Sequence, residues 1–326
     1  MRVVPRRRMA GKAIRAASAS CLIRISVRPQ RSCQPAAGAG ARAGERIMSF
    51  KNILVHLAAA ETDGPALRAA AVLARQHQAR LTGLHAYSLD WALLAATGEY
   101  INPHTLDAIL AEGRRTAANK AAQIQAQFER VLLEEAVPGA WRSVEGAVEV
   151  VLVQQARLAD LAVFGLGAAG GMEAELAETV LFQSGQPVLL VPQAPSRPFD
   201  PRRILVGWSN TRESARAIRD ALPLLRQAEA VRVLSIATEA DAMEPASAQA
   251  EAMARHLALH GVKASGAAGP AQSGAVQDAL LNASADFGAG LLVIGGYGHG
   301  RLREMVLGGV TRSLFRGATL PVLLSH

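Results

Sequence analysis

The sequence contains one arrangement of apolar segments twice, about 150 residues apart. From residue 51 it reads KNILVHL, a run of strand length, then DGPALRAAAVLARQHQA, whose apolar residues recur every three or four positions as on a helix. The strand-like RLTGLHAY follows. From residue 202 the same order returns as RRILVGW, TRESARAIRDALPLLRQA and VRVLSIAT. A repeat of this length predicts two homologous domains in tandem.

The ends of the two halves also match. DLAVFGLG (160–167) corresponds to GLLVIGGYG (290–298), and SGQPVLLVP (184–192) corresponds to ATLPVLLSH (318–326). Strands rich in Val, Ile and Leu without polar alternation indicate a parallel sheet covered by helices on both faces. Each half is therefore predicted to be a doubly wound, Rossmann-like α/β domain, with a mainly parallel five-stranded sheet flanked by helices.

The segment PQAPSRPFDPRR (192–203) has four prolines in twelve residues and is typical of a linker. We therefore predict a first domain at 48–196 and a second at 197–326, with residues 1–47 as a separate leader. The first domain also contains a helix-prone stretch, 107–136, with charges spread around it. It is interpreted as a surface helix with solvated faces and no chemistry.

The net charge of +8 suggests a nucleic-acid or membrane partner until its position is considered. Residues 1–47 contain eleven basic residues and one acid, which leaves the other 279 residues with a net charge of −2. The body is therefore expected to bind neither nucleic acid nor membrane, and its longest uncharged run, 179–196, contains three prolines. Both cysteines, Cys21 and Cys33, lie in the leader, which excludes a disulfide framework or cysteine catalysis in the body.

The leader is rich in Arg and poor in acids, and Arg24 and Arg28 interrupt its apolar stretch, so it does not resemble a secretory signal. An organellar transit peptide, a disordered tail and a misassigned start fit this composition. The last is favoured because Met48 opens MSFKNILVHL, which runs directly into a strand pattern. We accordingly expect a cytoplasmic protein.

The segment GGYGHGRLREMVLGGVT (295–311) contains two glycine clusters that indicate a ligand. Ligands of open parallel sheets bind beyond the carboxyl ends of the strands, and Gly295, Gly298 and Gly300 follow such a strand. Glycine lets backbone N–H groups approach an anion closely. Gly308 precedes a predicted helix start near Thr311, and helix N-termini also bind phosphate. Simple turns between strand and helix are the alternative interpretation.

These residues resemble the nucleotide-binding members of the universal stress proteins, the UspA superfamily. That family has a glycine, two residues, a glycine, nine residues, and a glycine followed by Ser or Thr. Gly295, Gly298 and Gly308 reproduce this spacing, with Gly309 in place of the hydroxyl residue. The resemblance covers both halves, about 279 residues, and implies a tandem protein of the family.

The resemblance implies a stress-response protein that binds ATP, or AMP or ADP, with Mg²⁺ as a further candidate. The nucleotide would lie across the ends of the first and fourth strands of the second half, with its adenine at the main chain near Ile236. It also implies that the last strands of the halves pair about a pseudo-twofold axis, and free sheet edges favour a homodimer. The predicted nucleotide-binding residues are Gly207, Trp208, Ser209, Ile236, Gly295, Gly298, His299, Gly300, Arg301, Gly308, Gly309, Val310 and Thr311.

Two departures from the family pattern bear on affinity. The loop after the first strand carries Ser209 where family ATP binders commonly have an aspartate, which removes a charge-assisted hydrogen bond of roughly 1.5–3 kcal/mol. The first half has no second glycine pair and instead has Glu173, Glu175 and Glu178 where phosphate would lie. We therefore expect at most one site per chain.

Catalytic chemistry is sparse in the sequence. A nucleotide-responsive binding protein with unidentified protein partners is the first hypothesis, and a slow ATPase or nucleotidyl transferase using His299 or Glu304 is the second. The third is a scaffold that no longer binds nucleotide. His256 and His260 have the spacing of helical zinc ligands, but no third ligand is evident, so no metal site is predicted. Arg301 can neutralise phosphate or lie on a solvated helix face.

Overall fold

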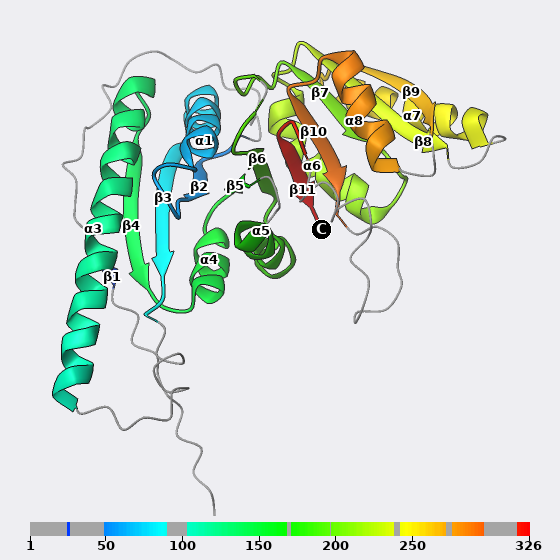
Figure 1. The fold of residues 1–326 in the computed structure, drawn as a ribbon. Helices are drawn as coiled ribbons and strands as arrows, with labels where there is room; N and C mark the ends of the chain where they lie inside the picture. The colour runs from blue at the N-terminus through cyan, green and yellow to red at the C-terminus, as the bar shows by residue number, and fades with distance from the viewer. Residues whose placement is uncertain are drawn as a thin grey trace, which may run out of the picture.

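The computed structural model describes residues 25–26, 49–89, 103–167, 171–195, 197–237, 242–271, 276–296 and 318–326. Within these residues the chain forms one large, mostly parallel sheet flanked by helices (Figure 1), which confirms the predicted α/β fold class. The first half contains β1 (Ile25–Ser26), β2 (Asn52–His56), α1 (Gly64–His77), β3 (Arg80–Tyr87), α3 (Pro103–Glu135), β4 (Gly139–Glu145), α4 (Val148–Ala156), β5 (Leu161–Leu166), α5 (Gly171–Ser184) and β6 (Val188–Pro192).

From the residues after the proline-rich segment, the second half repeats the order of the first from β2 to β5, and its last described strand pairs as β6 does. Its elements are β7 (Arg203–Gly207), α6 (Arg212–Leu225), β8 (Ala230–Ala237), α7 (Met243–Leu259), β9 (Ala264–Pro270), α8 (Val276–Phe287), β10 (Leu291–Gly295) and β11 (Val322–Ser325).

The strand order is β1-β4-β3-β2-β5-β6-β11-β10-β7-β8-β9. Five parallel strands come from each half, as predicted. The halves meet at β6 and β11, which pair antiparallel with Leu189 opposite Leu323. The predicted pairing of the two PVLL strands is therefore confirmed. Two residues of the leader, Ile25 and Ser26, pair antiparallel with the outer strand β4.

The apolar strands bury side chains on both faces of this sheet. One apolar layer lies under α1, α3, α6 and α7 and includes Leu67, Phe128 and Ile218. The other lies under α4, α5 and α8 and includes Leu152 and Val180. Because each layer contains residues of both halves, the core runs without a break across the β6 and β11 junction.

Helix α3 was predicted to be a surface helix with solvated faces, but part of it is buried. Among its described side chains none before Ala121 is buried, but Ile124, Phe128 and Val131 are at most 3% exposed. They recur at helical spacing and pack towards β3 and β4, with Phe128 tilted against Trp141 at 5.7 Å between ring centroids. The wholly solvated interpretation was therefore wrong for the second part of the helix. Among the described residues, no helix is long and apolar enough to cross a membrane.

Candidate functional site

The carboxyl ends of β7 and β10 form the topological switch point of the second half. From β7 the chain builds outward through β8 and β9 and then returns to place β10 on the other side of β7. Gly207 pairs with Ile294 in the parallel ladder, so Gly207 and Gly295 end neighbouring strands side by side. This is the position at which doubly wound sheets bind ligands.

Packing within the protein alone requires a glycine at position 295. A Cβ atom at this position would lie 2.4 Å from the Ser214 nitrogen and 2.5 Å from the Glu213 carbonyl carbon. The end of β10 thus rests directly on the backbone of the first turn of α6. The strand and the helix N-terminus meet here because residue 295 has no side chain.

Trp208 directs its side chain into the core and is only 8% exposed. Its N–H donates to the Leu234 carbonyl at 2.8 Å, and its carbonyl accepts from the Ser235 hydroxyl at 3.0 Å. The ring of Trp208 therefore belongs to the apolar core.

Ser209 is exposed and lies beside the N-terminus of α6. Its hydroxyl is 3.2 Å from the Thr211 hydroxyl, and Thr211 caps the helix in a reciprocal capping box with Ser214. In the same turn, burial acts to raise the pKa of Glu213, but hydrogen bonds, chiefly from the Arg212 guanidinium, leave that pKa lowered. The Glu213 carboxylate therefore lies at the positive N-terminus of α6, whether or not a ligand is bound there.

Ile236 lies on β8 beyond the end of β7. The β7 and β8 ladder ends where Gly207 faces Leu234, and the Trp208 N–H makes the next bond. Main-chain groups alternate sides along a strand, so those of Ile236 face the space past the end of β7, on the side of Leu234. This is the position predicted to meet the adenine, and it lies at the same edge as Gly207 and Gly295.

The other predicted site residues are outside the described part of the chain. They are Gly298, His299, Gly300, Arg301, Gly308, Gly309, Val310 and Thr311.

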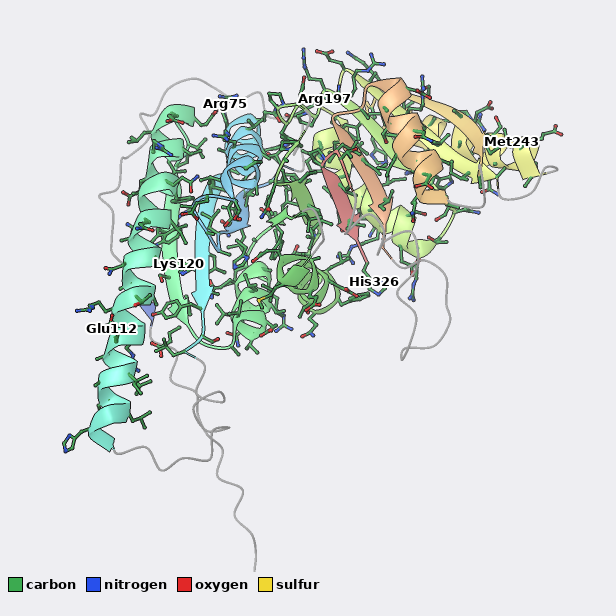
Figure 2. All side chains as sticks on the ribbon, in the orientation of Figure 1. Arg75, Glu112, Lys120, Arg197, Met243 and His326 are labelled. Atoms are coloured by element: carbon green, nitrogen blue, oxygen red, sulfur yellow. The ribbon has the colours of Figure 1, made fainter. Side chains whose placement is uncertain are left out.

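Contacts from the first half reach the beginning of the glycine segment. A Cβ atom on Gly296 would lie 3.3 Å from a Leu181 methyl group of α5, and the Gly296 carbonyl is 3.2 Å from His326 Nδ1. His326, labelled in Figure 2, also packs edge-on against Phe182 of α5 with ring centroids 4.6 Å apart. Sequence reasoning missed these residues because no local pattern links α5 to β10.

The first half has a different arrangement at its own switch point. Of the three predicted acids, Glu173 turns towards the end of β2 and lies 2.9 Å from His56 Nδ1, whereas Glu175 is exposed. Asp63, which the sequence analysis did not select, is 3% exposed and accepts the Ala58 and Ala59 N–H groups. Asp63 stands at the N-cap position of α1 but makes no side-chain capping bond to the helix, so its carboxylate holds the loop after β2 instead.

Among the described residues, no group of three or more His, Cys, Asp or Glu side chains is placed to hold a metal ion. His256 lies in the last turn of α7 and His260 is the C-cap residue of that helix, with ring centroids 5.0 Å apart and no third ligand beside them in the described part of the chain.

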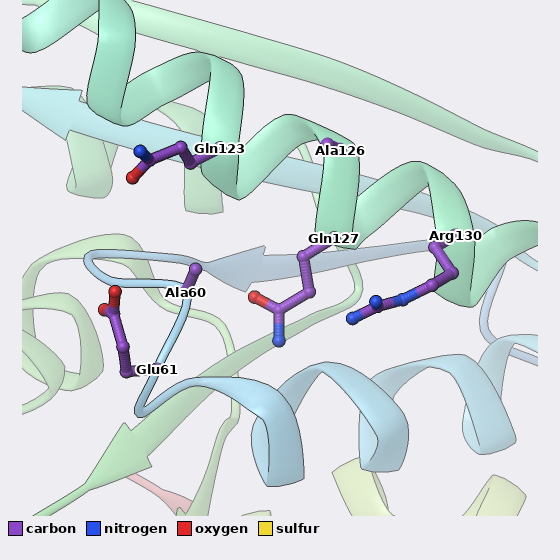
Figure 3. Close-up of a pocket in the computed structure, with 6 residues that line it drawn as sticks. All are labelled: Ala60, Glu61, Gln123, Ala126, Gln127 and Arg130. Atoms are coloured by element: carbon purple, nitrogen blue, oxygen red, sulfur yellow. The ribbon is translucent and has the colours of Figure 1, made fainter.

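Two surface grooves lie away from the predicted site. One of about 360 Å³ runs between α3 and the loop after β2 in the first half (Figure 3). The other, of about 330 Å³, lies beside the linker at the amino ends of β10 and β11, which is the opposite edge of the sheet from Gly295. The first is lined by Ala60, Glu61, Gln123, Ala126, Gln127 and Arg130.

The fold and the switch point define a class: paired, doubly wound α/β domains of the kind that bind ligands at the carboxyl edge of a parallel sheet. Residues 201–326 match the family model described as the Universal stress protein family. The second half of this chain is therefore a universal stress protein domain, and the first half repeats its fold. Among curated proteins, none matches the chain significantly.

Solved structures extend the likeness to both halves. A universal stress protein from Archaeoglobus fulgidus DSM 4304 is 16% identical with a TM-score of 0.60, over 84% of this chain and 95% of that one. A functionally unknown protein from Pseudomonas aeruginosa PAO1 is 17% identical with a TM-score of 0.52, over 86% of this chain and 93% of that one. At these identities the likeness is one of fold. A universal stress protein solved in complex with cAMP shares 22% identity over 45% of this chain and 99% of its own, with a TM-score of 0.33.

Proposed function

We propose that the second half binds one adenine nucleotide, ATP or a relative of it, and that the chain acts as a nucleotide-responsive regulatory protein in the stress response. The observation that carries the proposal is the meeting of Gly207 and Gly295 at the switch point, beside the main chain of Ile236. The family glycine spacing at Gly298 and Gly308 continues from that point.

The proposed role is binding without turnover. The described edge offers backbone groups, the Ser209 hydroxyl and a helix N-terminus, and these can orient a phosphate. Ser209 stands where family ATP binders commonly have an aspartate, so the charge-assisted hydrogen bond of that aspartate is missing. The affinity is therefore expected to be about ten- to a hundredfold weaker than that of a site with the aspartate.

Calorimetric titration of the chain with Mg-ATP, AMP and cAMP tests the proposal. Gly298→Val and Gly308→Val should abolish micromolar binding, because a branched side chain would fill the space of the phosphates. Gly295 is unsuitable for this test, since any Cβ there meets the α6 backbone. Gly64→Ala is the matched control, because its Cβ meets only the flexible ends of Arg68 and Gln127.

Absence of binding to the folded wild type at millimolar nucleotide would refute the proposal and favour a scaffold. Release of inorganic phosphate that is lost in His299→Ala would instead favour an ATPase.

A homodimer in the cytoplasm is part of the proposal. The edges of β6 and β11 are already paired within the chain, so the outer edges left for a second copy among the described strands are that of β9 and that of β4 with its two-residue partner β1. Light scattering of the full chain would measure the mass, and a monomer at micromolar concentration would exclude the dimer.

A further inference from the structure

The two halves can be superposed residue by residue at their switch points through the strand registers. Ile53 pairs with Leu161 in the first half, and Ile204 pairs with Leu291 in the second. Counting along the strands from these pairs, His56 corresponds to Gly207. The first half therefore places an imidazole where the second half has no side chain.

The His56 side chain is held by a carboxylate from α5. His56 Nδ1 lies 2.9 Å from Glu173 Oε2, with side-chain exposures of 2% for His56 and 22% for Glu173. Glu173 is in the first turn of α5, which begins at Gly171. The other ring nitrogen, Nε2, is buried without a hydrogen-bond partner among the described residues. The ring also packs against Phe164 at 5.6 Å between centroids.

Two further ionisable side chains lie near this pair. The Asp63 carboxylate is occupied by the Ala58 and Ala59 N–H groups at 2.6 and 2.8 Å. His85 of β3 is engaged through Nδ1 with the Leu57 carbonyl at 2.8 Å. The hydrogen bond that His56 makes among these side chains is therefore the one with Glu173, which joins the end of β2 to the start of α5.

An imidazole at the first turn of a helix is a favourable place for an anion, because the ring N–H and the positive helix end both attract it. Glu173 supplies that anion from within the chain. A tethered carboxylate is present at a high effective concentration and needs no association, so a free phosphate group competes poorly with it.

We propose that the first half is self-liganded: the Glu173 carboxylate occupies the anion position at His56, and its removal opens a phosphate-binding site there. The comparison with Gly207 rests on the proposed nucleotide function of the second half, whereas the His56 and Glu173 contact does not. The proposal explains why only one nucleotide site per chain is expected: in the first half, Glu173 takes the place of a phosphate at His56.

The test is thermal and urea unfolding of full-length Glu173→Ser in inorganic phosphate, against sodium chloride of the same ionic strength at pH 7. Phosphate should increase the stability of this variant by more than it increases that of wild type. At a phosphate concentration ten times the dissociation constant, the folding equilibrium constant of the variant should rise about elevenfold. Glu175→Ser, which removes an exposed acid two residues along α5, is the matched control and should respond as wild type does.

Two additional variants make the result specific. His56→Gln combined with Glu173→Ser should abolish the phosphate effect, because it removes the imidazole that the phosphate would contact. Glu173→Gln keeps the side-chain volume and should show a smaller effect, and it replaces Glu173→Ser if that variant does not fold. Titration of the His56 ¹⁵N resonances with phosphate in Glu173→Ser reports the contact directly.

Equal responses to phosphate in wild type, Glu175→Ser and the Glu173 variants would overturn the proposal. Nucleotide titration of the wild type addresses the second half separately. A wild type that binds no nucleotide, with a Glu173→Ser variant that binds phosphate, would refute the proposed function and leave this inference standing.

Discussion

His77 at the end of α1 makes stability depend on pH in a defined direction. The residue is 3% exposed, packs edge-on against Phe50 at 4.9 Å between ring centroids, and meets Gln227 of the other half, whose Nε2 is 3.2 Å from His77 Nδ1. Burial, and then the charge of Lys51, lowers the pKa of His77 from 6.5 to about 4. An amide N–H group directed at Nδ1 favours the neutral ring, so protonation would oppose this contact.

The sign follows from proton binding. Because the pKa is lower in the folded state, the unfolded chain binds more protons between pH 6.5 and pH 4, and stability falls as the pH falls through that range. The full difference is about 3 kcal/mol, and about 2 kcal/mol of it should be lost between pH 7.5 and pH 5. Urea unfolding of wild type and His77→Gln at those two pH values measures it.

The wild type should lose about 2 kcal/mol more than His77→Gln on acidification, because glutamine cannot take up the proton. His256→Gln, which replaces an exposed histidine on α7, is the control and should follow the wild type. Parallel pH dependence in wild type and His77→Gln would refute the reasoning.

Three further changes test the packing. Gly295→Ala should lower the free energy of unfolding by about 1–3 kcal/mol in urea, with or without nucleotide, because the new Cβ would lie 2.4 Å from the Ser214 nitrogen; an unchanged midpoint would contradict the close approach. Thr211→Ala should remove about 1 kcal/mol by deleting the α6 cap, and a stability equal to wild type would show that the capping box contributes nothing. Leu323→Ala, at the junction of the halves, should lose about 2–5 kcal/mol, whereas Leu133→Ala, 83% exposed, should stay within about 0.5 kcal/mol; similar losses from both would argue against a shared core.

The fold was predictable because its signals are local and repeated. Runs such as ILV at 53–55 and LLVI at 291–294 each form a buried strand, and the doubled order of elements implies two five-stranded units. The buried part of α3 was missed because Ile124 and Phe128 stand among charged and amide residues, and only the neighbouring strands show which side of the helix they cover.

The candidate site was predictable only where the sequence neighbours are also the spatial neighbours. The glycine spacing from Gly295 identified the strand end, but not that the α6 backbone itself excludes a side chain there. The acid at Glu173 was recognised as replacing phosphate, but its partner His56 is 117 residues away and required the strand register. A side-chain contact between segments so far apart in the chain leaves no periodic signal in either segment.

The two proposals together give the halves different roles on the same framework. In the first half, the Glu173 contact with His56 fixes the beginning of α5 against β2 independently of any ligand. Near its end, the same helix places Leu181 and Phe182 against Gly296 and His326, where the glycine segment of the second half begins. A helix anchored by an internal carboxylate is a fixed support for the residues at which that segment begins. Under the two proposals, the first half is thus the part that stays fixed, and the second half is the part whose nucleotide occupancy changes the surface offered to partners.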